Sequence, residues 1–145
     1  MYPSEVRQQI LTSQQALFAE LEALEALAQA PCPVTAEQLQ ARSAALVPKL
    51  IAHMKLDDSI LAPALEDTDA WRAFRLSRLQ EHHEHQAEGI VQIVRQLTNP
   101  TSDEQLCAVI LRVAAAVRAD FEEEQRLMLS PDVLRDDLVT VAAGA

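Results

Sequence analysis

The chain has 145 residues, which is the size of one ordinary domain and enough to bury a hydrophobic core without disulfide bonds or structural metals. Its formal net charge of −10 argues against a nucleic-acid partner, because proteins that bind the phosphate backbone need a basic surface. Only two glycines occur, and alanine, leucine, glutamate and glutamine are abundant, so we predict a single all-α domain over residues 1–145.

The location of the protein is expected to be the cytoplasm. No segment at the start of the chain has the basic-then-apolar pattern of a signal peptide, and no apolar run approaches the roughly 18–20 residues that span a bilayer. We therefore expect no membrane partner. The two cysteines, Cys32 and Cys107, lack the spacing of a metal or redox pair and are assigned to structure.

The first two predicted helices begin at capping residues. Ser4 is a candidate N-cap of the first helix, which the stretch APCPV ends. Thr35, followed three residues later by Gln38, has the spacing of a capping box at the start of the second helix. Pro48 lies inside the second helix and is expected to kink it, because proline removes a backbone hydrogen bond.

The third and fourth predicted helices follow two polar breaks. Thr68 or Asp69 can cap the third helix, and Ser102 with Gln105 repeats the capping-box spacing before the fourth. Long amphipathic helices with short connections predict an up-down-up-down antiparallel four-helix bundle. The expected helices span residues 4–29, 36–65, 69–97 and 103–129, and the tail 130–145 is not assigned.

Polar residues interrupt the apolar stripe of the second and fourth helices. His53 and Asp57 lie four residues apart in LIAHMKLDDSIL, on the same face of the predicted helix as Leu50. Asp120 and Glu124 repeat this spacing in the fourth helix. Among the consecutive acids that end with Glu124 only one can face inward, so Glu122 and Glu123 are assigned to the surface.

The third helix carries three histidines in EHHEHQ, and the first helix carries none. With the stripe taken from Leu79, Ile90, Ile93 and Leu97, His83 lies nearest the centre, His82 lies at the edge and His85 points away. His83 is therefore the first inward candidate and His82 the second. The first helix offers only the neutral Ser13 and Gln14 at this level.

These residues predict a metal site at one level of the core. Burying several ionised carboxylates is costly unless they are paired or bind a cation. Imidazoles and carboxylates at this spacing are typical ligands of metal sites in helical bundles. The alternative is that protonated histidines pair with the carboxylates or that water reaches them. The candidate ligands are His53, Asp57, His82, His83, Asp120 and Glu124.

The order of these motifs resembles the hemerythrin-like, or HHE cation-binding, family. The resemblance covers essentially the whole chain, from ILTSQQAL through LIAHMKLDDSIL and RLQEHHEHQ to ADFEEEQ. It implies a four-helix bundle with a non-haem di-iron centre. Three positions depart from the family pattern: Gln14 and Asp120 stand where histidine is expected, and Asp57 stands where glutamate is expected.

The resemblance implies oxygen or redox sensing, or iron handling, with one or two iron ions and with dioxygen or peroxide as a ligand. The few inward histidines argue against reversible O₂ carriage, and a carboxylate-rich site suits iron or manganese, with zinc as a further option. No enzymatic turnover is required by these residues. The competing hypothesis is a degenerate bundle that has lost the metal and serves as an interaction or structural module with an unknown protein partner.

Overall fold

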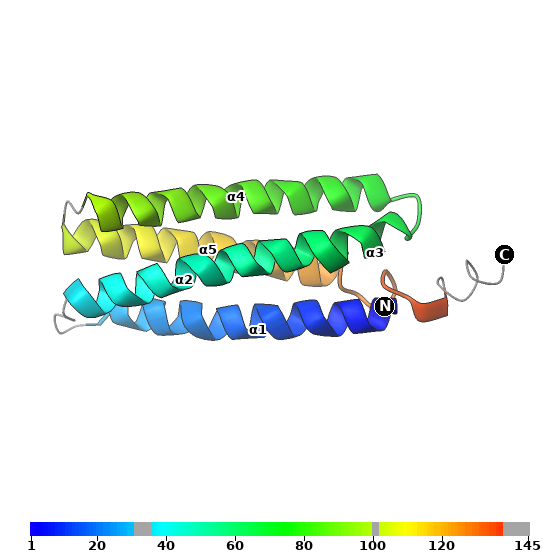
Figure 1. Ribbon diagram of the computed structural model, residues 1–145, viewed down its shortest axis with the longest axis horizontal. Coiled ribbons are helices and arrows are strands. Elements are labelled where there is room, and N and C mark those ends of the chain that lie inside the picture. The colour runs from blue at the N-terminus through cyan, green and yellow to red at the C-terminus, as the bar shows by residue number, and fades with distance from the viewer. Residues whose placement is uncertain (31–35, 100–101, 138–145) are drawn as a thin grey trace.

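The computed structural model describes residues 1–30, 36–99 and 102–137, and within these ranges its regular secondary structure is helical, with no strand. Four helical columns lie side by side (Figure 1). None of the helices in these ranges is both long and apolar enough to cross a membrane. The columns are α1 (Pro3–Ala28), α2 (Ala36–Leu56) continued by η1 (Asp57–Leu61) and α3 (Ala62–Glu66), α4 (Arg72–Thr98) and α5 (Asp103–Leu127).

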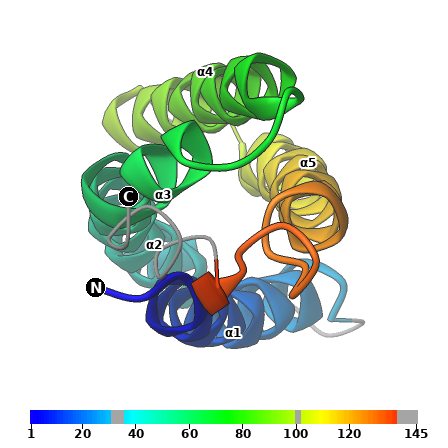
Figure 2. The same cartoon turned by 90° about the vertical axis from the view of Figure 1, so that its right-hand side faces the viewer.

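The columns surround a central core, as the end-on view shows (Figure 2). Helix α1 packs against α2 and α5, and α4 packs against the same two helices. Each column therefore presents one face to the core, which explains the predicted amphipathic stripes. The protein is an all-α four-helix bundle, and the predicted helix boundaries agree with the observed ones to within three residues.

Among the three helix starts whose predicted caps lie in the described residues, one agrees with the prediction. Ser102 caps α5 as predicted, because its side chain accepts a hydrogen bond from the Gln105 N–H at 3.1 Å. Ser4 is wrong as a cap, since α1 starts earlier, after Tyr2, and the Ser4 side chain binds Asp136 instead. The predicted cap at Thr35 lies outside the described residues.

The start of α4 also differs from the prediction. The helix begins at Arg72 instead of residue 69. Asp69 instead accepts hydrogen bonds from the backbone N–H of Trp71 at 2.9 Å and from the Arg75 side chain at 2.7 Å. The acid therefore stabilises the turn before the helix. Thr68 is not the cap either, because its hydroxyl donates to the Leu65 carbonyl at the end of α3.

The hydrogen-bond pattern of the second column changes after Leu56. Helix α2 runs through Pro48 without interruption. Residues Asp57–Leu61 form a π-helix, in which the N–H of Ala62 donates to the carbonyl of Asp57, five residues earlier. One-turn π segments inside α-helices are frequent at functional sites, because they change the direction of side chains locally. This segment carries Asp57, one of the predicted site residues.

The hydrophobic core is divided into two clusters. The larger cluster lies toward the ends of α1 and α4 and the starts of α2 and α5, and Cys107 is half-buried against it. The smaller cluster contains Ile10 of α1, Leu61 of η1, Leu79 of α4 and Met128, just after α5. Between these residues and the larger cluster, each column places polar side chains at the same level. Cys32, the other cysteine that was assigned to structure, lies outside the described residues.

Candidate metal centre

A layer of buried polar side chains crosses the core between the two hydrophobic clusters. All four columns contribute to it, and every member is less than a tenth exposed. Such a layer is unusual, because polar groups in a core lower stability unless they are hydrogen-bonded or bind a ligand. Its members are Gln14, His53, Asp57, His82, Gln86, Asp120 and Glu124.

Three members of this layer form a cluster of the size that one metal ion needs. His53, Asp57 and Glu124 each offer one nitrogen or oxygen atom, and these atoms lie within 4.8 Å of one another. His53 lies in the last turn of α2 and Asp57 begins the π-helix, and His53 Nε2 lies 3.4 Å from Asp57 Oδ2. Glu124 reaches them from α5. We call His53, Asp57 and Glu124 the core triad.

Two atoms of the core triad have no hydrogen-bond partner. His53 Nε2 and Asp57 Oδ1 are both inaccessible to solvent and form no hydrogen bond with any residue that the structure describes, although Nε2 lies 3.4 Å from Asp57 Oδ2. A buried atom of this kind costs about 1–3 kcal/mol when nothing compensates its lost hydration. The two atoms are an imidazole nitrogen and a carboxylate oxygen, which are ligand types for a first-row divalent metal. The residues present therefore fit a bound cation.

The other atoms of His53 and Asp57 are held by neighbouring helices. Ser13 Oγ of α1 shares a hydrogen bond of 2.7 Å with His53 Nδ1. His83 Nε2 of α4 lies at hydrogen-bond distance, 3.1 Å, from Asp57 Oδ2. The second nitrogen of His83 is 3.3 Å from Asp58 Oδ1 at the surface. His83 thus bridges a buried and an exposed carboxylate of the π-helix.

Glu124 is held from two sides. The side-chain amide of Gln14 donates to Glu124 Oε1 at 3.2 Å, and His82 Nδ1 lies 2.9 Å from Glu124 Oε2. The Gln125 amide donates to the Gln14 oxygen at 2.9 Å, which fixes the nitrogen of Gln14 toward Glu124. Gln14, at the position of the expected family histidine, therefore acts as a hydrogen-bond donor to the cluster.

The order of burial of the two α4 histidines is the reverse of the predicted one. His82 is fully buried, whereas the His83 side chain is 16% exposed. The physical reason is Gly89, whose ideal Cβ would stand 3.0 Å from a Val113 methyl group, so that α4 approaches α5 closely there. The predicted stripe includes Ile90, which is half-buried, and omits its buried neighbour Gly89.

His82 also contacts a residue that the sequence reasoning assigned to the surface. Its Nε2 lies 3.2 Å from Glu123 Oε1, and Glu123 in turn accepts a hydrogen bond of 2.6 Å from the Arg78 side chain. The series of contacts therefore ends at the surface in a salt bridge between Arg78 of α4 and Glu123 of α5. A basic residue one helical turn before His82 was the available signal for this contact. Both nitrogens of His82 are engaged.

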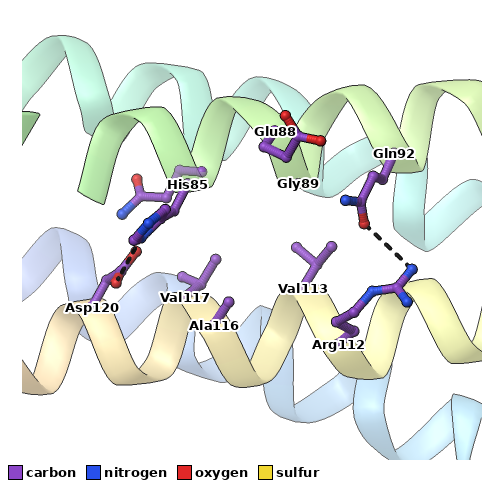
Figure 3. Close-up of a pocket in the computed structure, with 10 residues that line it drawn as sticks. His85, Glu88, Gly89, Gln92, Arg112, Val113, Ala116, Val117 and Asp120 are labelled. Atoms are coloured by element: carbon purple, nitrogen blue, oxygen red, sulfur yellow. Dashed lines mark hydrogen bonds and ion pairs between the residues drawn. The ribbon is translucent and has the colours of Figure 1, made fainter. Parts of the chain in front are cut away.

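Asp120 stands apart from the core triad, on the side of α4 and α5. Its Oδ1 lies 3.8 Å from His82 Nε2 and 3.6 Å from Nδ1 of the largely exposed His85, and its Oδ2 is buried without a partner. His85 points away from the core as predicted, but it folds back toward Asp120 (Figure 3). Asp120 is therefore a neighbour of the cluster and not a member of the core triad.

A groove of about 320 Å³ lies between α4 and α5 beside Asp120. Val113, Ala116 and Val117 of α5 form its apolar wall, and the Gln92–Arg112 pair lies at its other end (Figure 3). Gln86 of α4 also borders it, and both polar atoms of the Gln86 side chain are buried without partners. The groove brings solvent to the edge of the polar layer.

Burial and neighbouring charges change the protonation equilibria of the layer. Burial raises the pKa of Glu124 to about 7, although the hydrogen bond with His82 opposes this. Burial also lowers the pKa of His53, against the attraction of Asp57, so its imidazole is neutral and keeps a lone pair at neutral pH. A neutral imidazole is the form that binds metal.

The other titratable members are governed by their partners. Burial lowers the pKa values of His82 and His83, but hydrogen bonds and charges from Glu124 and Asp57 respectively outweigh it, so both pKa values are raised. Burial raises the pKa of Asp120, although the charges of His82 and His85 lower it. In the absence of a cation, the layer therefore shares protons among its acids and histidines.

Comparisons of the chain with protein-family models, with curated proteins and with solved structures gave no significant match. The resemblance to hemerythrin-like proteins therefore rests on the motifs of the sequence.

Proposed function

We propose that this protein binds a divalent metal ion of the iron type in the core of its bundle, with the core triad as ligands, and that it serves in oxygen or redox sensing or in iron handling. The observation that supports this best is the pair of unpartnered buried atoms, His53 Nε2 and Asp57 Oδ1, next to Glu124. One cation would satisfy both atoms and balance the carboxylates. Iron and manganese suit this oxygen-rich set better than soft metals do.

A single ion is the simplest occupancy of this cluster. His82 is already hydrogen-bonded through both nitrogens, and Asp120 lies on the α4–α5 side. A second ion would require His82 and Asp120 to release their present partners. Three protein ligands would leave positions for water, dioxygen or peroxide, and a bound iron ion would supply one-electron redox chemistry. The chain itself orients the ligands and excludes bulk water from them.

The arrangement of the helices belongs to the same proposal. An up-down-up-down antiparallel order is supported by the short connections and by the packing of consecutive columns against each other. This order, the cytoplasmic location and the hemerythrin-like relationship stay predictions.

A metal-free interaction or structural module is the second candidate. It is favoured by the hydrogen bonds of Gln14 and His82, which satisfy Glu124 without any cation. It leaves His53 Nε2 and Asp57 Oδ1 without partners, and a metal-free core would be more stable with apolar residues there. The metal-binding proposal accounts for more of the layer.

The test is an anaerobic titration of the metal-free protein with Fe(II) and, separately, Mn(II), followed by calorimetry. The wild-type chain is expected to bind about one equivalent. The variant His53→Ala should lose at least about tenfold in affinity, because it removes a ligand. His85→Ala is the matched control, since it removes a histidine that lies outside the core triad. Absence of binding to the wild type would favour the metal-free module.

A further inference from the structure

We infer that Ser13 is a positioning residue that selects Nε2 of His53 as the metal-binding atom; this rests on the proposed metal site. The selection follows from two contacts of the imidazole. Ser13 Oγ is hydrogen-bonded to Nδ1 at 2.7 Å, and Nε2 is buried without a partner beside Asp57. Ser13 comes from α1 and His53 from α2, so the contact also fixes the ring across a helix interface.

An imidazole can bind a metal only through a nitrogen that carries no proton. In a neutral ring the proton sits on one nitrogen, and the hydrogen bond at that nitrogen fixes the tautomer. When Ser13 Oγ accepts the Nδ1 proton of His53, the lone pair stands on Nε2, next to Asp57. Histidine ligands almost always have such an outer partner, and its loss typically lowers metal affinity 10- to 100-fold.

The ring of His53 has one further restraint. It packs against Phe121 of α5, with the ring centroids 4.9 Å apart and the planes inclined by 57°. Phe121 restricts the volume open to the ring, but an apolar contact cannot distinguish the two nitrogens. Among the contacts described for His53, only the Ser13 hydroxyl recognises Nδ1. Ser13 therefore occupies Nδ1 from the side of α1 and leaves Nε2 facing Asp57.

Ser13 is also an outer contact that can be removed without changing charge. Glu124 and Asp57 are held by His82 and His83, and replacing either imidazole would alter the electrostatics of the layer. Ser13→Ala deletes one hydroxyl and leaves every ionisable group in place. Thr12→Ala is the matched control, because Thr12 is the exposed neighbour of Ser13 on α1 and its hydroxyl accepts only from Gln8 in the described contacts.

The experiment is a titration of metal-free protein with ¹¹³Cd(II), with NMR of chains carrying ¹⁵N-labelled histidine. The wild type should show a ¹¹³Cd–¹⁵N coupling to Nε2 of His53. Ser13→Ala should bind Cd(II) about 10- to 100-fold more weakly than the wild type. Ser13→Thr keeps a hydroxyl, so its affinity for Cd(II) should lie within about threefold of the wild-type value. Thr12→Ala should have the same affinity for Cd(II) as the wild type.

Four outcomes would overturn the inference. Equal Cd(II) affinity of Ser13→Ala and wild type, or coupling to Nδ1 in the wild type, would refute the role of Ser13 while leaving the metal site intact. An equal loss in Thr12→Ala would assign the effect to weakening of α1. No binding of Cd(II), Fe(II) or Mn(II) to the wild type would refute the metal site and this inference together.

Discussion

At the scale of single residues, the polar layer combines atoms that are paired with atoms that are not. Glu124 has partners for both oxygens, whereas His53 Nε2 and Asp57 Oδ1 have none. Gln86 is a separate case, because both atoms of its amide are buried without partners. A bound cation would satisfy His53 Nε2 and Asp57 Oδ1, whereas the amide of Gln86 lies outside the core triad. These differences lead to two predictions.

Replacing Gln86 by leucine should stabilise the metal-free protein by about 1–2 kcal/mol, because it removes two buried polar atoms that have no hydrogen-bond partner. The free energy of unfolding would be measured by urea denaturation. Gln80→Leu at an exposed position of α4 is the control and should change stability by less than about 0.5 kcal/mol. A clear loss of stability in Gln86→Leu would mean that the amide is hydrogen-bonded in solution.

The stability of the metal-free protein should fall as the pH rises from 5 to 8. Burial raises the pKa of Glu124 from 4.5 to about 7, so the folded state binds this proton more tightly than the unfolded state does. The associated stabilisation is complete below 4.5 and is lost as the pH rises through 7. The raised pKa values of His82 and His83 act in the same direction, and the lowered pKa of His53 opposes them below 6.5.

Glu124→Gln separates this effect from the rest of the layer. The amide cannot ionise, so the dependence of Tm on pH between 5 and 8 should become flatter than in the wild type. Thermal unfolding followed by circular dichroism in the presence of a chelator would measure it. A wild-type Tm that rises over this pH range would contradict the assignment of a raised pKa to Glu124.

At the scale of the elements, two local features of the backbone determine which side chains enter the layer. The π-helix Asp57–Leu61 begins at a core-triad residue, and α4 approaches α5 closely at Gly89. The 3.6-residue period predicted the helices and the inward positions of His53, Asp57, Asp120 and Glu124, because their neighbours on the stripe are large and apolar. It missed the π-helix, since a change in hydrogen-bond register has no distinct composition.

The helical period also ranked His83 above His82 as the inward histidine, and this error has a physical reason. A glycine at the centre of a buried face has no side chain to register in a hydrophobic pattern, so the stripe appeared to pass through Ile90. Ser13 was placed at the correct level but its partner was not predicted, because the contact joins residues 40 positions apart in different helices. Contacts of this kind depend on the relative rotation of helices, which a single helical period does not specify.

Gly89→Ala should destabilise the protein by about 1 kcal/mol, even though alanine is the better helix former by a similar amount. The new Cβ would stand 3.0 and 3.3 Å from the two methyl groups of Val113, whose branched side chain is stiff. In a Val113→Ala background the same substitution should stabilise the protein. Urea denaturation of the four proteins gives the coupling, and additivity of the two substitutions would contradict close packing at Gly89.

At the scale of the whole molecule, the bundle accepts a polar layer between two hydrophobic clusters. A layer of this kind has two explanations with opposite consequences for stability. As a metal site it contributes binding energy to folding, and as a metal-free core it is a source of instability. The fold alone does not distinguish these explanations, because both use the same helices and the same apolar stripes.

The double variant Asp57→Leu with Glu124→Leu distinguishes them through the sign of its effect. In the metal-loaded protein it should lower Tm, because the binding energy linked to folding is lost. In chelator-treated protein it should raise Tm, because it removes two buried carboxyl groups. Differential scanning calorimetry with and without Fe(II) measures both. A higher Tm under both conditions would support the metal-free module.

The central claim, that the core triad holds a metal ion, is tested most directly by the metal content of the protein. The chain would be purified without a histidine tag or chelator from cells supplied with iron, manganese and zinc, and analysed by mass spectrometry. We predict about one equivalent of iron or manganese per chain, with a second equivalent only if His82 and Asp120 rearrange. A content near zero that stays near zero after anaerobic reconstitution with Fe(II) would contradict the claim.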